Sequence, residues 1–421
     1  MSGAKNLTIA QLKKLRLNTP SFSQNVYPHY EALRDAGGVL WSESHKSWLI
    51  SSYDCVKALL LSPNASVEKM SPFVNQATGD VQETMIVMHK VMEHWLPFID
   101  PPEHTRLRLI LQRSFAPRAL QQHEPMIRAT VRKVINGFGD RREIEFLDEF
   151  AFQFPALVIT DFFGMPSDEV KRIREWSAGI AEFVLGSGKE GRYENSAGMM
   201  REMKAFFGDL VATRSSELAA GAQRSEKLLD QLLLTMDSDS GLNSDEIVST
   251  LILILFAAPE TTASMLVNSM LALLSNRPQL QQLSDDRNLI GPAMEELIRY
   301  DGPVPAVVRV AKEDMEIGGQ HIHAGQRIFL LLKSANRDPA QFPNPEVLDF
   351  GRGRSGHIGF GMGIHLCLGA PLARMESRIA FEELLAHYED FELPDQEIVW
   401  RHELLAHSPH ALRVGLVPRV G

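Results

Sequence analysis

Apolar residues recur at helical spacing through most of the chain before Asp301. A period near 3.6 residues places such side chains on one face of a helix. The pattern predicts helices in several segments. The clearest of these are 30–35, 56–61, 106–115, 126–138 and 173–185. This part of the chain is therefore expected to be mainly helical.

Two stretches have the composition of short strands joined by tight turns. The first spans 38–51, where two apolar triplets flank a polar tetrapeptide. In the second, at 315–332, Gly318-Gly319 signals a turn, and 321–323 with 326–329 alternate like one half-buried strand. Each stretch is expected to form a hairpin, so a small β part should accompany a large α part.

The organisation of the chain favours one domain over residues 1–421. The chain shows no repeat of 20 to 50 residues and no long Gly/Ser-rich or Pro-rich linker. The apolar segment 247–274 has the length of a membrane span, but Pro259 to Thr262 interrupt it, which favours a buried core helix. The polar start from Met1 to Leu17 shows no secretory signal, so no membrane anchor is expected.

Composition narrows the class of protein. Hydrophobic residues make up 44% and charged residues 23%, which is typical of a soluble globular protein. The 43 basic and 53 acidic residues give a net charge of −10, which argues against a general binder of nucleic acid or anionic membranes. The only two cysteines, Cys55 and Cys367, cannot build a disulfide framework, so a reducing cytoplasm is expected.

The most informative segment runs from Phe360 to Gly369, contains Cys367, and is followed by the helix-forming 370–374. Its Phe, Gly, Gly, His, Cys and Gly stand at the spacings of the cysteine-ligand loop of the cytochromes P-450, which it resembles at every one of these positions. The resemblance implies a mainly α fold with small β-sheets in a single compact haem domain. It also implies a heme b cofactor (iron protoporphyrin IX) whose iron is bound by Cys367.

Chemistry explains the residue types in this loop. An iron-bound thiolate needs backbone N–H donors aimed at the sulfur and a chain that passes close to the macrocycle. Gly361, Gly363 and Gly369 are expected to take backbone angles closed to other residues, while Phe360 shields the sulfur from water. A helix that starts near Leu368 would turn its positive end toward Cys367.

Other interpretations of these residues exist. His357, His365 and Cys367 are possible zinc ligands, but a fourth ligand at a recognised spacing is missing. A dinucleotide loop lacks its G-x-G-x-x-G spacing and its preceding strand. Cys55 has no comparable context and is expected to be a packing residue.

Distant segments resemble the family's partners of the haem propionates. His104 and Arg108 are four residues apart and match its propionate-binding helix, and Arg309 and His365 match its remaining partners. Each of these alone is as well explained by an ordinary surface salt bridge. Glu296 and Arg299 match the family's Glu-x-x-Arg pair, with both side chains on one helix face.

The segment from Ala257 to Thr262 resembles the family's oxygen-activating helix. Glu260 and Thr261 match its acid–alcohol pair, which relays protons through water to the distal oxygen. The alternative is a Thr bonded to its own helix and a solvated Glu. Ala258 stands where the family usually has Gly, and Pro259 is expected to kink the helix. Candidate substrate contacts on this resemblance are Ala257, Ala258, Val304 and Val307.

The resemblance implies an enzyme that inserts one oxygen atom from O2 into an apolar small organic molecule, normally by hydroxylation. The chain has no room for a flavin reductase module, so the electrons are expected from a separate ferredoxin and ferredoxin reductase. Arg106, Arg108, Arg113 and Arg118 are candidate contacts for an acidic partner. A peroxide-driven haem-thiolate enzyme and a non-catalytic haem or metal-binding protein are the alternatives.

Overall fold

The computed structural model describes residues 7–68, 80–185, 192–236, 241–352, 356–402 and 406–419. The chain folds into two compact units that both combine separate segments of the sequence. The first unit contains Met1–Ser66, Ile127–Phe152 and Thr261–Gly421, and the second contains Val67–Met126 and Gln153–Glu260. Because the chain passes between the units repeatedly, neither is a continuous stretch. The single haem domain over 1–421 stays a proposal.

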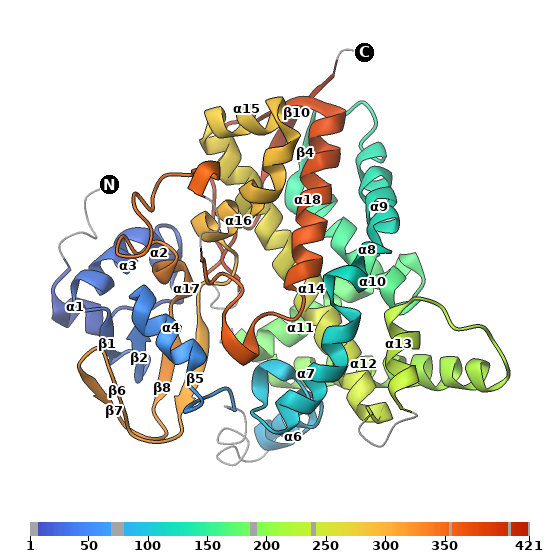
Figure 1. Cartoon of the computed structure of the whole chain (residues 1–421), viewed down its shortest axis with the longest axis horizontal. Coiled ribbons are helices and arrows are strands. Elements are labelled where there is room, and N and C mark those ends of the chain that lie inside the picture. Colours follow the sequence, from blue (N-terminus) through green and yellow to red (C-terminus); the bar gives the residue numbers. More distant parts are fainter. Residues whose placement is uncertain are drawn as a thin grey trace. The chain divides into compact units, whose positions relative to one another are not determined.

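A five-stranded sheet organises the first unit, in the strand order β1-β2-β8-β5-β3 (Figure 1). Its strands are β1 (Val39–Ser42), β2 (Ser47–Ile50), β3 (Ala65–Ser66), β5 (Val307–Ala311) and β8 (Arg327–Leu330). β1 pairs with β2 in antiparallel fashion, with Val39 opposite Ile50, which confirms the first predicted hairpin. β2 and β8 run parallel, and the other pairs are antiparallel.

The second predicted hairpin is also present, with one correction. β6 (Met315–Ile317) and β7 (Gln320–Ile322) pair in antiparallel fashion across Gly318-Gly319. The expectation of one strand from 321 to 329 is wrong, because β7 ends at Ile322 and β8 belongs to the five-stranded sheet. The backbone turns between them at Gly325, whose φ is +80°.

Helices and a smaller sheet complete the first unit. The helices are α1 (Ile9–Lys13), α2 (Pro20–Ser23), α3 (Val26–Asp35), α4 (Tyr53–Leu61), the π-helix η2 (Leu147–Ala151), α15 (Arg277–Asp285), η4 (Arg287–Leu289), α16 (Ile290–Asp301), α17 (Leu332–Ala335), η5 (Phe350–Arg352), η6 (Gly363–His365) and α18 (Ala370–His387). The three-stranded sheet has the order β4 (Glu143–Glu145), β10 (Arg413–Pro418) and β9 (Tyr388–Glu392). Apolar side chains of the five-stranded sheet pack against α4 in one core, which includes Ile50, Val56, Leu59 and Ile328.

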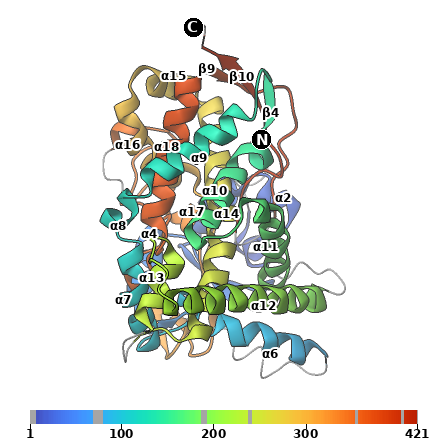
Figure 2. The same cartoon turned by 90° about the vertical axis from the view of Figure 1, so that its right-hand side faces the viewer.

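The second unit is helical in its described part. Its helices are α6 (Asp80–Met92), η1 (Leu96–Phe98), α7 (Glu103–Ser114), α8 (Pro117–Gln121), α10 (Gln153–Phe163), η3 (Ser167–Glu169), α11 (Val170–Leu185), α12 (Arg192–Ala219) and α13 (Leu228–Thr235). α6 and α11 both pack against the long helix α12, and Figure 2 shows α6 alongside it. The buried Trp176 of α11 meets Phe206 and Phe207 of α12 at ring-centroid distances of 5.3 and 6.1 Å.

Two helices contribute residues to both units, α9 (Glu124–Asn136) and α14 (Ser244–Ser275). The five helices expected at the clearest apolar segments are confirmed as α3, α4, α7, α9 and α11, with shifted ends. α14 is long and apolar enough to cross a membrane, yet 67% of its most apolar window is buried inside the protein. It remains one helix through Pro259, because burial outweighs the backbone hydrogen bond that proline cannot donate.

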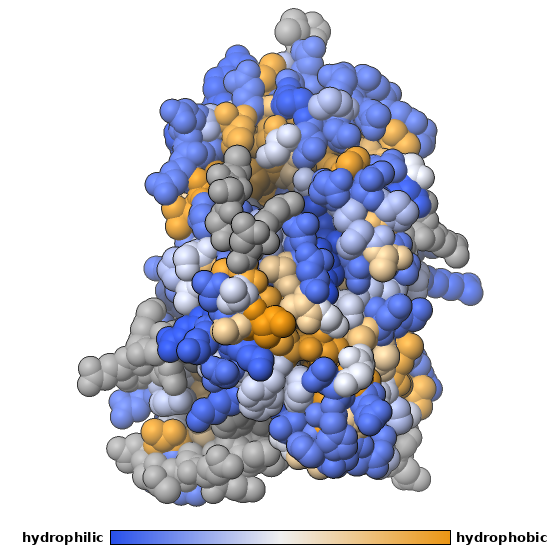
Figure 3. Space-filling view, turned by 90° about the vertical axis from the view of Figure 1, so that its left-hand side faces the viewer, coloured by the Kyte–Doolittle hydropathy of each residue, from blue (hydrophilic) through white to orange (hydrophobic). Residues whose placement is uncertain are grey.

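The molecular surface mixes polar and apolar side chains. Figure 3 shows one face on which hydrophobic residues form patches between hydrophilic ones. Exposed apolar side chains are common on soluble proteins. Two of the large exposed ones, Ile364 and Leu366, matter for function because they lie in the cysteine loop.

Candidate active site

The segment from Phe360 to Gly369 folds as a tight loop that its own backbone closes. The N–H of Cys367 donates to the carbonyl of Phe360 at an N···O distance of 2.9 Å. The N–H of Leu366 donates to the carbonyl of Gly363 at 3.1 Å. Backbone hydrogen bonds thus fix the position of Cys367 inside the loop without help from its side chain.

Two glycines of the loop are required by its backbone. Gly361 and Gly363 have φ angles of 73° and 72°, a region that costs other residues about 1 to 2 kcal/mol. A Cβ on Gly363 would also lie 3.0 Å from the carbonyl oxygen of Leu60. The same expectation for Gly369 is wrong. Its φ of −79° is open to any residue, and a Cβ there would meet nothing within 4 Å.

Cys367 is exposed on this loop, directly before α18. The preceding residues Ile364 and Leu366 are 51% and 41% exposed, so the same loop also carries apolar side chains that face outward. Gly369 is the N-cap of α18, and the unpaired N–H groups of a helix start stabilise negative charge beside them. The loop therefore offers an accessible sulfur beside exposed apolar side chains, near a helix start that favours negative charge.

A second set of contacts supports the loop from α16 and α18. The guanidinium of Arg374 lies 4.6 Å from the ring centroid of Phe360. Arg374 Nε also donates to Glu295 Oε1 at 2.6 Å, and His357 Nε2 lies 3.1 Å from Glu295 Oε2. His357 Nδ1 accepts the N–H of Gly359 at 3.1 Å, which ties this set to the start of the loop.

The electrostatics of this set depend on Glu295. Burial by itself would raise the pKa of Glu295, but hydrogen bonds from His357 and Arg374 lower that pKa to about 2. The carboxylate is therefore ionised at any physiological pH. Sequence reasoning missed Glu295 and Arg374, and it considered His357 only as a zinc ligand. The available signal was a cation, Arg374, in the first turns of the helix that follows the loop.

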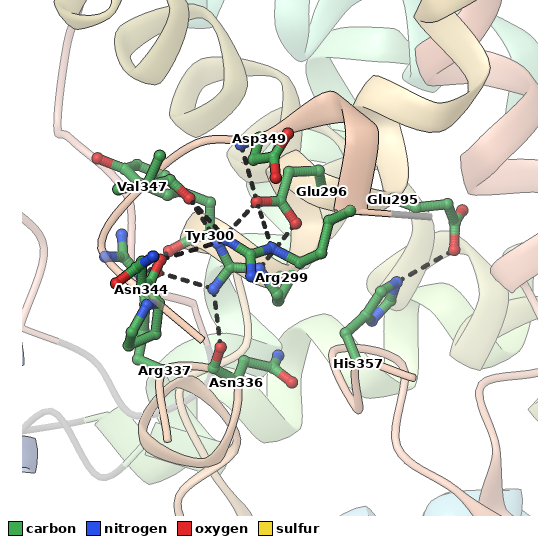
Figure 4. A network of polar contacts seen from close by, with 12 residues as sticks. Glu295, Glu296, Arg299, Tyr300, Asn336, Arg337, Asn344, Val347, Asp349 and His357 are labelled. Atoms are coloured by element: carbon green, nitrogen blue, oxygen red, sulfur yellow. Dashed lines mark hydrogen bonds and ion pairs between the residues drawn. The ribbon is translucent and has the colours of Figure 1, made fainter. Parts of the chain in front are cut away.

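Glu296 and Arg299 form the centre of a buried polar network (Figure 4). Arg299 Nε donates to Glu296 Oε2 at 2.7 Å, and Nη2 donates to Oε1 at 2.8 Å. The guanidinium also donates to the carbonyls of Asn336 at 3.0 Å and Val347 at 3.1 Å. Asp349 N–H donates to Glu296 Oε1 at 3.0 Å. The pair thereby connects α16 to the long segment that leads toward the cysteine loop.

The oxygen-activating candidates lie in the middle of α14. Ala257, Ala258, Glu260 and Thr261 are all half-buried, whereas Pro259 is buried. They occupy successive positions of one continuous helix. Each of the four half-buried side chains thus retains access to solvent or to a bound molecule.

The next residue of α14 makes a contact that sequence reasoning did not anticipate. The hydroxyl of Thr262 donates to Glu376 Oε2 of α18 at 3.2 Å. Glu376 is 1% exposed, and its Oε1 has no hydrogen-bond partner among the described residues. Burial raises the pKa of Glu376 to about 8, against a small lowering by the Thr262 hydrogen bond. The folded protein therefore holds a neutral carboxylic acid beside α14 at neutral pH.

This proton predicts a pH dependence of stability. The ordinary pKa of the carboxyl is 4.5, so between 4.5 and about 8 the folded state keeps a proton that the unfolded chain has released. The free energy of unfolding should fall as pH rises through this interval, by up to about 1.4 kcal/mol per pH unit. Glu376→Gln should remove this contribution, as urea melts of the two proteins across the interval would show. The exposed Glu389→Gln is the control. Equal pH profiles for wild type and Glu376→Gln would contradict the protonated carboxyl.

The four candidate propionate partners fall into two pairs. His104 and Arg108 lie on α7 in the second unit, and Arg309 and His365 lie on β5 and η6 in the first. His104 is 1% exposed, and burial, with a smaller effect of Arg108, lowers its pKa to about 4. Its imidazole is therefore neutral at physiological pH. Arg309 is buried and donates to the carbonyl of Val308 at 2.9 Å.

The remaining candidates pack against the core of the first unit. Val304 and Val307 are partly buried and contact the core that the five-stranded sheet shares with α4. Cys55 packs against the same core, in agreement with its expected packing role, and it forms no disulfide with Cys367.

Comparisons with known proteins match this architecture and this loop. The family model "Cytochrome P450" matches residues 190–286 and 286–410. The "Biotin biosynthesis cytochrome P450" of Bacillus subtilis is 31% identical over 91% of this chain and 94% of its own length. The "Vitamin D(3) 25-hydroxylase" of Pseudonocardia autotrophica is 32% identical over 98% and 99%. The crystal structure of P450BioI with an acyl carrier protein that carries hexadec-9Z-enoic acid superposes with a TM-score of 0.85. It is 30% identical and covers 94% of this chain and 100% of its own.

A mainly helical fold with small sheets and an exposed thiol on a glycine-bearing loop before a helix defines the class of haem-thiolate proteins. The chain belongs to the cytochrome P450 family. It is accordingly an oxidoreductase, a haem-thiolate monooxygenase that acts on an organic substrate with O2 and electrons from redox partners. The residues around Cys367 fit haem, because one loop carries an exposed sulfur and exposed apolar side chains that can meet a flat macrocycle.

Proposed function

We propose that the chain binds heme b through Cys367 and inserts one oxygen atom from O2 into an apolar small organic molecule. The observation that carries this proposal is the backbone-closed loop before α18, which carries the exposed Cys367 together with the exposed apolar Ile364 and Leu366. When bound, haem supplies the binding and reductive activation of O2. Every other step depends on the residues of the chain.

The protein would hold the cofactor by two kinds of contact. Cys367 would provide the sulfur that binds the iron, and Phe360 and Gly361 belong to the loop that contains it. Arg309 is a buried cation, and its burial would strengthen an ion pair with a haem propionate. His365 lies within the loop itself, two residues before Cys367. These residues explain how the first unit can bind a dianionic macrocycle.

His104 would act as a neutral hydrogen-bond donor and Arg108 as a cation toward the propionates. The low pKa of His104 supports this division, because a neutral imidazole still donates through one ring nitrogen. The i, i+4 spacing on α7 places both side chains on one helix face. Gly369, the N-cap of α18, has no side chain, and a Cβ built there would have no atom within 4 Å. The space beside the helix start is therefore open.

Glu260 and Thr261 would move protons to the oxygen that is being reduced. O–O cleavage consumes two protons, and a carboxylate beside a hydroxyl can relay them through water. Both side chains are half-buried, so water can reach them from solvent. Thr262 is buried and bonded to Glu376, which leaves Thr261 as the accessible hydroxyl of this pair.

The substrate would be apolar, because its candidate contacts Ala257, Ala258, Val304 and Val307 are small or aliphatic and partly accessible. Relatives support this class by name, since one is a vitamin D(3) hydroxylase and another was crystallised with a fatty acyl chain. Each of these molecules offers mainly hydrocarbon surface, which binds through the hydrophobic effect.

The electrons would come from a ferredoxin and its reductase in the cytoplasm. Arg113 of α7 and Arg118 of α8 are exposed and can meet an acidic partner. Arg106, which the sequence placed in the same group, pairs instead with Glu103 at 2.9 Å and with Glu246. The charge of Arg106 is thus neutralised within the second unit, and Arg113 and Arg118 are the better candidates to contact an acidic redox partner.

Thr261→Ala tests the proton relay and the source of the oxygen atom together. Substrate binding should survive, but NAD(P)H should be oxidised with less product and more hydrogen peroxide, because protons arrive without the hydroxyl's guidance. We expect product per electron to fall about tenfold or more, in line with the contribution of a positioned acid–base group. Measuring NAD(P)H consumed, peroxide released and product formed checks this expectation.

Thr261→Ser, which keeps the hydroxyl, is the matched control and should restore coupling. A peroxide-driven enzyme would instead turn over with H2O2 at equal rates in wild type and Thr261→Ala, and with donors in neither. Unchanged coupling in Thr261→Ala would remove this residue from the mechanism.

A further inference from the structure

The hairpin of β6 and β7 carries a cluster of metal-ligand side chains far from the cysteine loop in sequence. Among the described residues, one group of three His, Cys, Asp or Glu side chains brings its ligand atoms within 4.8 Å of one another, and it consists of Asp314, His321 and His323. All three are exposed, at 54%, 50% and 63% of their side-chain surface. We propose that they form a binding site for a zinc-type divalent ion.

The distances within the cluster suit coordination. His321 Nε2 lies 3.2 Å and His323 Nδ1 lies 3.3 Å from the same atom, Asp314 Oδ2. Zinc bonds to imidazole nitrogen and carboxylate oxygen are about 2.0 to 2.2 Å long. Two ligands of a tetrahedral ion are then separated by about 3.3 Å, the edge of a tetrahedron with such bonds. Both histidines thus converge on one oxygen with the separations that a shared ion demands.

Strand geometry explains why the two histidines share a face. Residues at i and i+2 of an extended segment point to the same side, and the residue between them points to the other. Ile322 is accordingly 0% exposed and belongs to the core with Val39 and Val56, while His321 and His323 face solvent. The ring centroids of the histidines are 4.5 Å apart. The buried side chain of Ile322 therefore holds the backbone of both histidines in place. An ion would have to order only the histidine side chains.

Asp314 is held in a ligating orientation by the backbone. The N–H of Ala324 donates to Asp314 Oδ1 at 2.9 Å, which leaves Oδ2 directed toward the imidazoles. This hydrogen bond, followed by those of His323 and His321, lowers the pKa of Asp314, so the carboxylate is ionised at neutral pH. A hydrogen bond to the second carboxylate oxygen is the usual support of a metal-ligating carboxylate.

The ligand set selects the kind of ion. Two imidazoles favour zinc, nickel or copper(II) over magnesium and calcium, which prefer oxygen ligands. Three protein ligands leave a fourth tetrahedral position, which water would fill at this exposed site. Acidification should weaken binding, because protons compete for the same nitrogen atoms.

The chain offers a control set at the C-terminal end of α6 and just beyond it. His89 Nδ1 lies 3.4 Å from Glu93 Oε2, whereas His94 Nε2 lies 3.9 Å from the other oxygen, Oε1. This set has the same ligand types, two histidines and one carboxylate, although its histidines are less exposed, at 27% and 28% of their side-chain surface. Its histidines approach different oxygens, so it lacks the convergence that defines the hairpin site.

The test is a zinc titration of the holoenzyme without a polyhistidine tag, after removal of metal by EDTA and in competition with a chromophoric zinc chelator. In the holoenzyme the Cys367 thiolate is committed to haem and does not compete. We expect one zinc ion per chain. The affinity should fall about tenfold or more in Asp314→Asn, His321→Gln and His323→Gln, but not in His89→Gln/His94→Gln. Excess magnesium should leave zinc binding unchanged.

The ferrous–CO spectrum of each variant reports its fold independently of zinc. An intact spectrum with undiminished zinc affinity in all three hairpin variants would overturn the proposal. Loss of zinc binding in His89→Gln/His94→Gln instead would also overturn it, since the ion would then belong to that set of residues. If a hairpin variant misfolds, the test is the rate of amide hydrogen exchange of residues 314–323 in the wild-type protein, measured with and without zinc. Slower exchange with zinc supports the site, and unchanged exchange contradicts it.

Discussion

Cys367→His is expected to abolish the strongly red-shifted absorption band of the ferrous–CO complex. That band depends on electron donation from an axial thiolate, which an imidazole does not provide. The loop should still form, because its closing hydrogen bonds run through the backbone of Phe360, Gly363, Leu366 and Cys367 and use no side-chain atom of the cysteine. Haem can therefore remain bound while its spectrum changes, and the monooxygenase rate should fall below detection.

The measurement is the difference spectrum between the reduced protein with CO and the reduced protein without CO, together with a haem assay of the same sample. Cys55→Ala is the matched control. Cys55 packs against the core of the first unit, so its substitution should leave the band in place. A red-shifted band in Cys367→His would mean that another residue supplies the sulfur, and Cys55 is the sole other cysteine. If the red-shifted band disappeared in Cys55→Ala, Cys55 and not Cys367 would be the iron ligand.

The cysteine loop was predictable because its determinants are local. Gly361 and Gly363 have positive φ, Phe360 accepts the closing hydrogen bond, and α18 begins where the sequence changes to helix formers. Each of these features can be read from adjacent residues. The helical segments were equally accessible, since apolar spacing reports directly on the buried face of a helix. In contrast, the angle expected for Gly369 failed, because the residue is an N-cap with an ordinary φ.

Contacts between distant segments were not accessible in this way. Glu295 meets His357 and Arg374 across 62 and 79 residues, and Thr262 meets Glu376 across 114. Nothing in the local pattern around Glu295 distinguishes it from a solvated helix residue. Distant contacts also explain why the pKa values of two carboxyls shift in opposite directions. The fold gives Glu295 two partners, His357 and Arg374, which lower its pKa. It gives Glu376 a single hydroxyl, so burial raises the pKa of Glu376.

The division of 321–329 between β7 and β8 shows a related limit. Alternation alone fits one strand through this segment, and only the turn at Gly325 separates the two. The separation has a functional consequence. It leaves His321 and His323 on the solvent side of the small hairpin, where they meet Asp314.

The second large effect is expected from the buried pair Glu296 and Arg299. Their side chains are 3% and 0% exposed, and the guanidinium makes hydrogen bonds to Glu296 and to the carbonyls of Asn336 and Val347. Removing Glu296 leaves the charge of Arg299 uncompensated in the protein interior, which costs about 3 to 5 kcal/mol. Removing Arg299 costs less, because Glu296 keeps its ion pair with Arg352 at 3.1 Å. Glu296→Ala should therefore lower the free energy of unfolding by about 3 to 5 kcal/mol, and little haem should be recovered with it. Arg299→Ala should lower both quantities in the same direction but by less.

A second Glu-x-x-Arg pair in the chain distinguishes the effect of burial on stability from the effect of the motif itself. Glu169 and Arg172 have the identical Glu-x-x-Arg spacing, with an N···O distance of 3.5 Å, but their side chains are 20% and 38% exposed. Because water solvates either charge when its partner is lost, Glu169→Ala should cost less than about 1 kcal/mol. Urea melts and the haem content of Glu296→Ala and Glu169→Ala make the comparison. Equal losses would mean that the motif stabilises through local helix contacts. A selective loss in Glu296→Ala would show that the network across α16 and residues 336–349 fixes the segment that leads to Cys367.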